Sequence, residues 1–307
     1  MGGTRVRMML ANLDGTPAAR WDTHIPEAQK SPEHIVSLLH TGLDAMLVSV
    51  PLAPLLHITA GAPGITDVER GVVLSAPNLA GWTAVPLVQL LEARFGVPAA
   101  VDNDTNLAAL GEGAAGAARG IDDFIFVALG TGVGAGIVLR GKLHRGRNGS
   151  AGEIGYLPIA GAPRQPLRLS ETGQLEGSIG GLGVEARWRD LLQGSNRSDA
   201  VEIAGLRAPE VFDLAERGDA LAMELLQWVA QLLADALQAV TLLLDPAMIV
   251  LGGGVGSHRS LSAATATMLA KNDFPVPEIR PSSLGTQAQL FGAVAVSLAA
   301  LDAARRC

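Results

Sequence analysis

Glycine-rich turns beside apolar strands constrain the fold of this chain more than any other sequence feature. Four such strings each follow or begin a predicted strand: Gly2-Gly3-Thr4, Gly61-Ala62-Pro63-Gly64, Gly130-Thr131-Gly132 and Gly252-Gly253-Gly254. In turns of this kind backbone N–H groups can converge on phosphate oxygens, and a threonine hydroxyl adds an uncharged donor. Any one string alone is better explained as a tight turn. Their recurrence favours a ligand that carries phosphate.

Strands and helices alternate in two successive units, each of which begins with a hairpin. The first unit has predicted strands at 5–12, 21–25, 55–59 and 97–101, and helices that begin at Pro32 and cover 83–95 and 105–118. The second has strands at 124–129, 135–139 and 248–251, helices at 208–217, 219–244 and 287–305, and an irregular glycine-rich stretch up to residue 183. This order predicts an α/β fold, and 307 residues leave room for about two domains. We expect a smaller sugar- and phosphate-binding domain of residues 1–104 plus the final helix 287–307, and a larger nucleotide-binding domain of residues 105–286.

Composition narrows the function classes. The net charge of −7 leaves no electrostatic footprint for nucleic acid or an anionic membrane. The single cysteine, Cys307, excludes an internal disulfide and a cysteine-based zinc site. The longest apolar stretch, 221–244, carries a polar helical stripe, and we find no signal peptide. We therefore expect a cytoplasmic protein that binds neither nucleic acid nor membrane.

Carboxylates near the glycine-rich strings are candidates for acid–base chemistry. Asp104 follows a predicted strand with Asn103 beside it, and Glu153 and Glu176 lie in glycine-flanked loops. Such a carboxylate can take the proton of a hydroxyl that attacks a phosphoryl group. The alternatives are that Asp104 caps the following helix and that the two glutamates are solvated loop residues.

The ordered set of sequence strings resembles the ROK family of bacterial sugar kinases and sugar-responsive repressors. The matching strings are GGTRVRMMLANLDG at the start, GAPG, APNLAGW, VDNDTNLAALGEG, ALGTGVGAGIVLRGKLHRGRNGSAGEIG and IVLGGG. The resemblance implies an actin-like ATPase (ribonuclease H-like) fold, with duplicated domains and a cleft between them.

Residue roles follow from the resemblance. It implies that Asp104 is the general base and that Asn78, Asn103, Glu153 and Glu176 hold the other sugar hydroxyls. It implies that Gly3, Thr4, Gly130, Thr131 and Gly132 face the ATP phosphates and that Gly253 and Gly254 lie near the adenosine. Tyr156 is either a sugar hydrogen-bond donor or a packed loop residue, whereas for Trp82 a core position is favoured over stacking on sugar. The implied ligands are a sugar, ATP and Mg²⁺, and a homodimer is the family's habit.

Two departures from the family pattern change these expectations. The family's first strand and its aspartate, which helps to place Mg²⁺, would precede Gly2, so we expect that the natural protein begins further upstream or that this is a fragment. Family zinc ligands are replaced by Tyr156, Leu167, Leu169 and Gln174. We therefore predict no bound metal and no zinc, with the loop held by apolar packing instead.

Three functions fit these observations. The first is ATP-dependent phosphorylation of a hexose or N-acetylhexosamine, which the retained Asp104 favours. The alternative is the sugar-sensing effector domain of a ROK-type transcriptional repressor whose helix-turn-helix lies outside this chain. A third is a paralogue that has lost ATP binding.

Overall fold

The computed structural model describes residues 5–26, 29–50, 54–76, 79, 81–163, 166–168 and 171–306. The chain forms two compact units. The first unit comprises Met1–Ala115, Arg145–Ala151 and Gln287–Cys307, and the second comprises Gly116–His144 and Gly152–Thr286. The chain thus returns briefly to the first unit at 145–151. Compared with the expected boundary at residue 104, the first unit also holds the helix that begins at Asp104.

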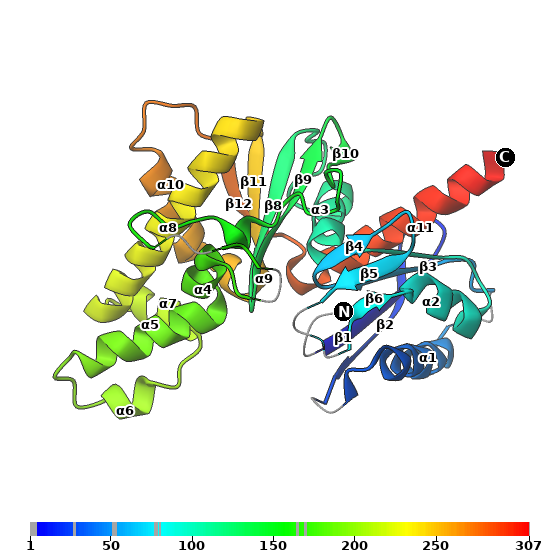
Figure 1. The fold of residues 1–307 in the computed structure, drawn as a ribbon, viewed down its shortest axis with the longest axis horizontal. Helices are drawn as coiled ribbons and strands as arrows, with labels where there is room; N and C mark the ends of the chain where they lie inside the picture. The colour runs from blue at the N-terminus through cyan, green and yellow to red at the C-terminus, as the bar shows by residue number, and fades with distance from the viewer. Residues whose placement is uncertain are drawn as a thin grey trace. The chain divides into compact units, whose positions relative to one another are not determined.

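The first unit contains short sheets and four helices among its described residues. Its strands are β1 (Arg5–Ala11), β2 (Pro17–His24), β3 (Ile58–Ala62), β4 (Ile65–Asp67), β5 (Val72–Ser75), β6 (Thr83–Val85) and β7 (Ala99–Asn103). Its helices are α1 (Pro32–Leu47), α2 (Leu87–Phe95), α3 (Asp104–Ala115) and α11 (Ala288–Arg306) (Figure 1). The predicted hairpin is confirmed, with Gly15 at φ +84° in its turn. The predicted cap of α1 is also confirmed, because the Ser31 hydroxyl accepts the His34 N–H at 3.3 Å.

The strands of the first unit pair in three separate sheets. β1 pairs antiparallel with β2, β3 pairs parallel with β7, and β4, β5 and β6 form a meander. Within the described residues, β1 and β3 each have one strand neighbour. Within these residues, each of the two strands therefore carries one edge without a ladder partner.

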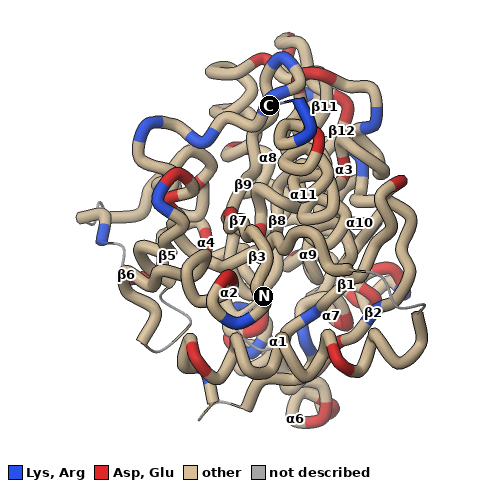
Figure 2. Tube along the Cα trace, turned by 90° about the vertical axis from the view of Figure 1, so that its right-hand side faces the viewer, with Lys and Arg blue, Asp and Glu red and all other residues tan. Residues whose placement is uncertain are grey.

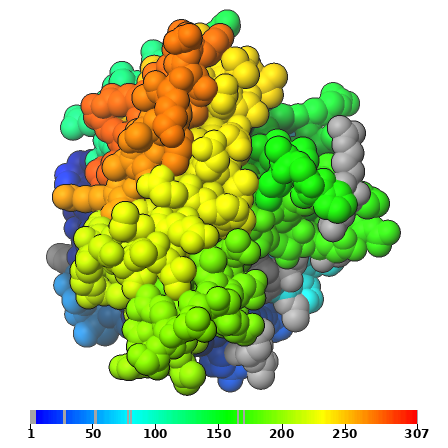
Figure 3. Space-filling model, turned by 90° about the vertical axis from the view of Figure 1, so that its left-hand side faces the viewer, coloured from blue at the N-terminus to red at the C-terminus, as the bar shows by residue number. Residues whose placement is uncertain are grey.

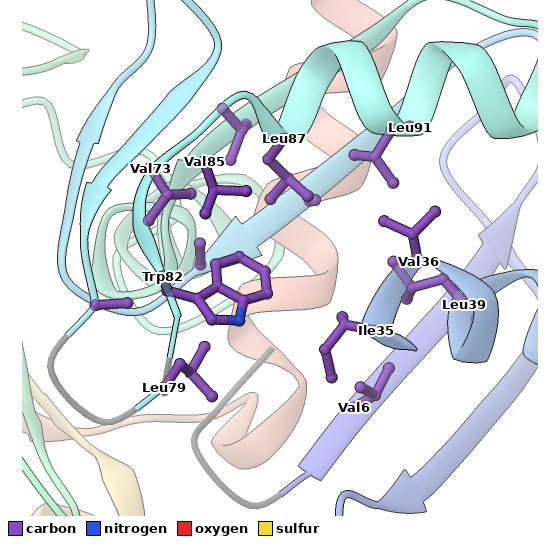
Figure 4. Close-up of a cluster of buried hydrophobic side chains, with 14 of the residues drawn as sticks. Val6, Ile35, Val36, Leu39, Val73, Leu79, Trp82, Val85, Leu87 and Leu91 are labelled. Atoms are coloured by element: carbon purple, nitrogen blue, oxygen red, sulfur yellow. The ribbon is translucent and has the colours of Figure 1, made fainter. Parts of the chain in front are cut away.

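Buried side chains from helices and strands form the core of the first unit (Figure 4). Val6 of β1, Ile35 of α1 and Leu87 and Leu91 of α2 are all 1% exposed or less. Trp82 is 1% exposed in the same cluster, and its indole N–H donates to the Lys30 carbonyl at 2.6 Å. The core position favoured for Trp82 is confirmed, and the ring offers no surface for a sugar.

The second unit is built on one five-stranded sheet in the order β10-β9-β8-β11-β12. Its strands are β8 (Phe124–Leu129), β9 (Val133–Leu139), β10 (Lys142–Leu143), β11 (Met248–Gly252) and β12 (Glu278–Pro281). Its helices are α4 (Gln174–Ile179), α5 (Gly181–Gln193), α6 (Ala200–Ile203), α7 (Ala208–Glu216), α8 (Ala220–Leu244), α9 (Gly253–Gly256) and α10 (Arg259–Leu269), with 3-10 turns at Ile154–Tyr156 and Gly285–Gln287. α10 lies alongside α8 on one face of this unit (Figure 3). β8 and β11 run parallel as neighbours, so the turns that follow them lie at one sheet edge.

Several predicted elements were wrong in extent or type, and three of them changed the description of the fold. The helix predicted at 83–95 begins at Leu87, because Pro86 disfavours the helical conformation at Val85, and Thr83–Val85 pair with β5 as β6 instead. The strand predicted at 55–59 lies at Ile58–Ala62. The stretch expected to be irregular up to residue 183 contains α4 and the start of α5.

Charged residues and long apolar helices bear on what the surface could bind. Figure 2 shows Lys and Arg interspersed with Asp and Glu along the described trace. By length and hydropathy alone, Ala220–Leu244 and Gly285–Arg306 would be long enough to span a membrane. The first is α8, half of whose apolar window is buried within the fold against neighbours such as α7 and α10. The second packs on α3, although only 11% of its window is buried.

Two glycines allow α3 and α11 to approach closely. A side chain at Gly111 would overlap the Ala288 carbonyl, and one at Gly292 would overlap the Leu107 carbonyl, both well inside van der Waals contact. The overlapping atoms are backbone, which cannot rotate away. The first turn of α3 carries Asp104, so the contact with α11 helps to hold Asp104 in place.

Replacing Gly292 with Leu is expected to force the two helices apart. Overpacking of a core typically costs ~1–3 kcal/mol, and a backbone overlap places this variant at the upper end of that range. Thermal unfolding by circular dichroism measures the effect. Ala299→Leu, at an exposed position of the same helix, is the matched control and should change the Tm little. Equal Tm values for the two variants would contradict the close contact.

Candidate functional site

The turn from β7 into α3 presents Asp104 as the first residue of the helix. The Asn103 side-chain oxygen accepts the N–H groups of Thr105 at 2.8 Å and Asn106 at 3.1 Å. Its amide nitrogen donates to the Gly64 carbonyl at 2.8 Å. Asn103 is therefore the helix cap, and the alternative that Asp104 serves as the cap is wrong. The part that Asn103 plays toward a sugar stays a prediction.

The Asp104 carboxylate has the electrostatics of a general base. Burial raises the pKa of Asp104 above the ordinary 3.8, and hydrogen bonds from the Thr105 N–H and hydroxyl oppose that rise less strongly. The hydroxyl contact is long, at 3.4 Å. A carboxylate with a raised pKa holds a proton better than a surface aspartate, which suits proton abstraction near neutral pH.

Two predicted nucleotide turns lie next to each other in the second unit. The N–H of Gly130 donates to the Gly132 carbonyl at 2.9 Å and closes the turn after β8. The position that a Cβ would take on Gly130 is 4.0 Å from the Gly254 nitrogen. Gly253 has φ +82° and lies against the Leu129 backbone, where a side chain would overlap the carbonyl. The structure therefore brings these two predicted turns together, as the parallel pairing of β8 and β11 requires.

The N-terminus of α5 adds a feature that the sequence reasoning missed. The Gly181 N–H donates to the Gly130 carbonyl at 2.7 Å, and a Cβ on Gly180 would be 3.1 Å from the Thr131 carbonyl oxygen. Gly180 caps the helix without a side-chain hydrogen bond. The partial positive charge of a helix N-terminus beside a glycine-rich turn favours phosphate. The signal that would have found it is the Gly180-Gly181 pair directly before an amphipathic segment.

Three predicted sugar-binding residues gather in the second unit. Glu176 lies in the first turn of α4, half-buried, and its carboxylate accepts the Val133 N–H at 2.8 Å. Burial raises the pKa of the Tyr156 phenol, and the Glu153 and Glu176 carboxylates raise it further. Tyr156 thus lies near both glutamates. The expectation of a loop position for Glu176 was wrong, because glycines at 173 and 177 flank and interrupt a short helix instead of marking a loop.

Gln174 holds the loop in which the family pattern places its zinc ligands. Its amide nitrogen donates to the Pro163 carbonyl at 2.6 Å, and its oxygen accepts the Ile159 N–H at 3.2 Å. Leu167 is 76% exposed, so the expectation that this leucine packs the loop was wrong. Leu169 lies outside the described residues. A cavity of about 310 Å³ opens here, lined by Tyr156, Leu167, Arg168, Thr172 and Gln174 among others.

The donors at these positions do not fit zinc. Among the described parts of the chain, no group of three or more His, Cys, Asp or Glu side chains is placed to hold a metal ion. A phenol, an exposed leucine and an amide already bonded to backbone replace the expected ligands. The absence of zinc itself stays a prediction that elemental analysis checks.

Removing the Gln174 amide is expected to loosen the loop that contains Ile159 and Pro163, because its two hydrogen bonds to the backbone are lost. Each lost hydrogen bond contributes about 0.5–1.5 kcal/mol, so Gln174→Ala should speed exchange of the Ile159 amide roughly 2-fold to 12-fold. Hydrogen exchange by mass spectrometry measures this. Gln231→Ala, which removes a surface hydrogen bond to Asp235 on α8, is the control and should leave the loop unchanged. Unchanged exchange in Gln174→Ala would show that the two hydrogen bonds of Gln174 do not hold the loop.

Some predicted site residues cannot be placed. Asn78, Gly3 and Thr4 lie outside the described residues. Their expected contacts with sugar and phosphate stay predictions.

Fold and site together define a class: a two-unit α/β protein with adjacent glycine turns and a half-buried carboxylate at the start of a helix. A known protein with the same architecture is the ROK family glucokinase from Streptomyces griseus, solved in complex with glucose and AMPPNP. It superposes with a TM-score of 0.83 at 27% identity over 97% of each chain. The fold is therefore the actin-like ATPase fold with two domains.

Sequence relatives agree with this class. A glucokinase from Halalkalibacterium halodurans is 33% identical over 265 residues, which cover 83% of this chain and 78% of the relative. A xylose repressor from Caldicellulosiruptor bescii is 40% identical over 129 residues, 41% of this chain and 32% of the repressor. The model of the ROK family matches residues 1–300. This chain belongs to the ROK family.

Proposed function

We propose that the chain is a sugar kinase that transfers the γ-phosphoryl group of ATP to a hexose or N-acetylhexosamine. Asp104 takes the proton of the acceptor hydroxyl as that oxygen attacks the γ-phosphorus. The bond to the β-phosphate oxygen breaks, and ADP leaves. The observation that carries the proposal is the half-buried Asp104 carboxylate with its raised pKa at the capped start of α3.

The second unit carries most of the other predicted site residues. Gly130, Thr131 and Gly132, with the N-terminus of α5 beside them, suit the ATP phosphates, and Gly253 and Gly254 suit the adenosine side. Glu153, Tyr156 and Glu176 offer carboxylates and a phenol for sugar hydroxyls. Mg²⁺ enters as part of the nucleotide substrate, where it neutralises charge that develops on the phosphates.

Relatives that are named as glucokinases support this proposal. The glucokinase matches most of the chain, and the matched structure carries glucose and AMPPNP. We also propose that the protein works in the cytoplasm and forms a dimer, which gel filtration with light scattering would test.

A coupled ADP-release assay tests the function. Purified protein is given MgATP with glucose, mannose, fructose, N-acetylglucosamine or N-acetylmannosamine. Turnover with at least one sugar that Asp104→Asn abolishes is the expected result. Sugar binding by calorimetry without turnover would instead favour the effector domain of a repressor, to which the xylose repressor match points.

A further inference from the structure

A partly buried ion pair lies on the strand that leads to the candidate base. The Arg145 guanidinium donates twice to one oxygen of Asp102, from Nε at 3.1 Å and from Nη2 at 2.6 Å. The Asp102 side chain is 3% exposed and that of Arg145 is 36% exposed. Asp102 is a residue of β7, two positions before Asp104.

The second oxygen of Asp102 is directed at the same turn. It accepts the Asn103 N–H at 2.8 Å and the side-chain amide of Asn106 at 3.1 Å. Both oxygens of Asp102 therefore accept hydrogen bonds within the protein, one from Arg145 and the other from Asn103 and Asn106. A buried carboxylate of this kind depends on its cation, because a charge left unpaired away from water is strongly disfavoured.

These hydrogen bonds enclose the backbone of Asp104. Asn103 on one side caps the helix and holds the Gly64 carbonyl, and Asn106 on the other side is tied to Asp102. The orientation of Asp104 thus depends on where Asp102 lies.

Arg145 belongs to the segment 145–151, which also leads into the sugar-binding loop of the second unit. The Ala151 N–H donates to the Arg145 carbonyl at 3.2 Å and closes this segment on itself. A Cβ on Gly149 would be 2.8 Å from the Thr66 carbonyl oxygen, so the segment also lies against β4. Glu153 follows two residues after Ala151. One guanidinium therefore anchors the chain that leads to Glu153 onto the strand that leads to Asp104.

We propose that Arg145, acting through Asp102, is a positioning residue for phosphoryl transfer: it fixes the Asp104 turn and anchors the segment 145–151 beside that turn. This inference rests on the proposed kinase function. Arg145 touches no reacting atom in this scheme. Misplacement of a reacting group by about 1 Å can cost ~10²-fold in rate.

Arg145→Ala tests the proposal, with Arg147→Ala as the matched control on an exposed arginine of the same segment. We expect Arg145→Ala to lower kcat/KM for the sugar by ~10²-fold while the KM for MgATP stays within about a factor of two. Added guanidinium should restore at least part of the lost rate, and Arg145→Lys should keep part of it. Arg147→Ala should behave as wild type.

A double-mutant comparison separates positioning from general damage to the fold. Because removing both partners leaves no unpaired buried charge, Arg145→Ala combined with Asp102→Asn should be no less active than Arg145→Ala alone. Wild-type-like kcat/KM in Arg145→Ala, or a loss that guanidinium leaves untouched, would overturn the positioning role while leaving the kinase function intact. Absence of turnover in the wild-type chain would overturn the kinase function, and the positioning role with it.

Discussion

Asp104→Asn will abolish sugar phosphorylation and at the same time raise the Tm at neutral pH. Asn has the shape of Asp without the ability to accept the hydroxyl proton, so kcat should fall by about 10²–10⁴-fold. In the wild type, kcat/KM should fall on acidification at a higher pH than an ordinary aspartate near 3.8 would give, because burial raises the pKa of Asp104. Steady-state rates across pH measure both effects.

The gain in stability follows from the same raised pKa of Asp104. A carboxyl group whose folded pKa exceeds its unfolded pKa contributes stability that is present below the unfolded value. That stability is lost as pH rises through the folded value. At neutral pH the wild type has lost this stability because Asp104 is charged in a partly buried position, and the uncharged Asn avoids that loss. The difference in Tm between variant and wild type should therefore shrink as pH falls through the raised pKa.

Asp199→Asn is the control of opposite sign. Hydrogen bonds from Arg197 lower the pKa of Asp199, so this carboxylate stabilises the fold at neutral pH and its Asn variant should have a lower Tm. A lower Tm in Asp104→Asn at pH 7 would mean that the Asp104 carboxylate is paired in the folded protein, and it would remove the electrostatic argument for the base.

Elements with strong periodicity and clear end signals could be read from the sequence. The helix predicted at 219–244 is α8 at Ala220–Leu244, and the final helix differs by one residue at each end. α8 has an apolar face at helical spacing and is capped by Asp219, and the final helix is an unbroken run without glycine or proline after Gly292. Short strands such as β4 and β6, three residues each, carry too little alternation to be found.

The candidate site was predictable as a set of residues and not as a set of contacts. Asn103 and Asp104 are both good helix caps by type, and only the backbone decides which side chain reaches the N–H groups. The bond from Glu176 to the Val133 N–H joins residues 43 positions apart. Gln174 bonds to two backbone groups, and the sequence does not distinguish these groups from the backbone groups of other residues. Contacts of these kinds depend on tertiary structure and leave little local signal.

Gly152→Ala is the other substitution with a large expected effect, because this glycine begins the loop of Glu153. Gly152 has φ +96°, and a Cβ there would overlap the Ala135 carbonyl of β9. Its own carbonyl accepts the Ala135 N–H at 2.7 Å, so the chain cannot shift without breaking a bond to the sheet. Left-handed strain and backbone overlap together should lower the free energy of unfolding by about 2–5 kcal/mol.

Gly218→Ala separates the two contributions, since the control shares the backbone strain and lacks the overlap. Gly218 has φ +89° with nothing within 4 Å of its Cβ position, so its variant should lose only about 1–2 kcal/mol. Urea unfolding followed by circular dichroism compares the two. If the kinase function holds, Gly152→Ala should also raise the sugar KM, because displacement of the loop moves Glu153, whereas Gly218→Ala should not. Equal unfolding midpoints for the two variants would show that the Glu153 loop tolerates a side chain at its start. The close approach of Gly152 to β9 would then not hold the Glu153 carboxylate in place.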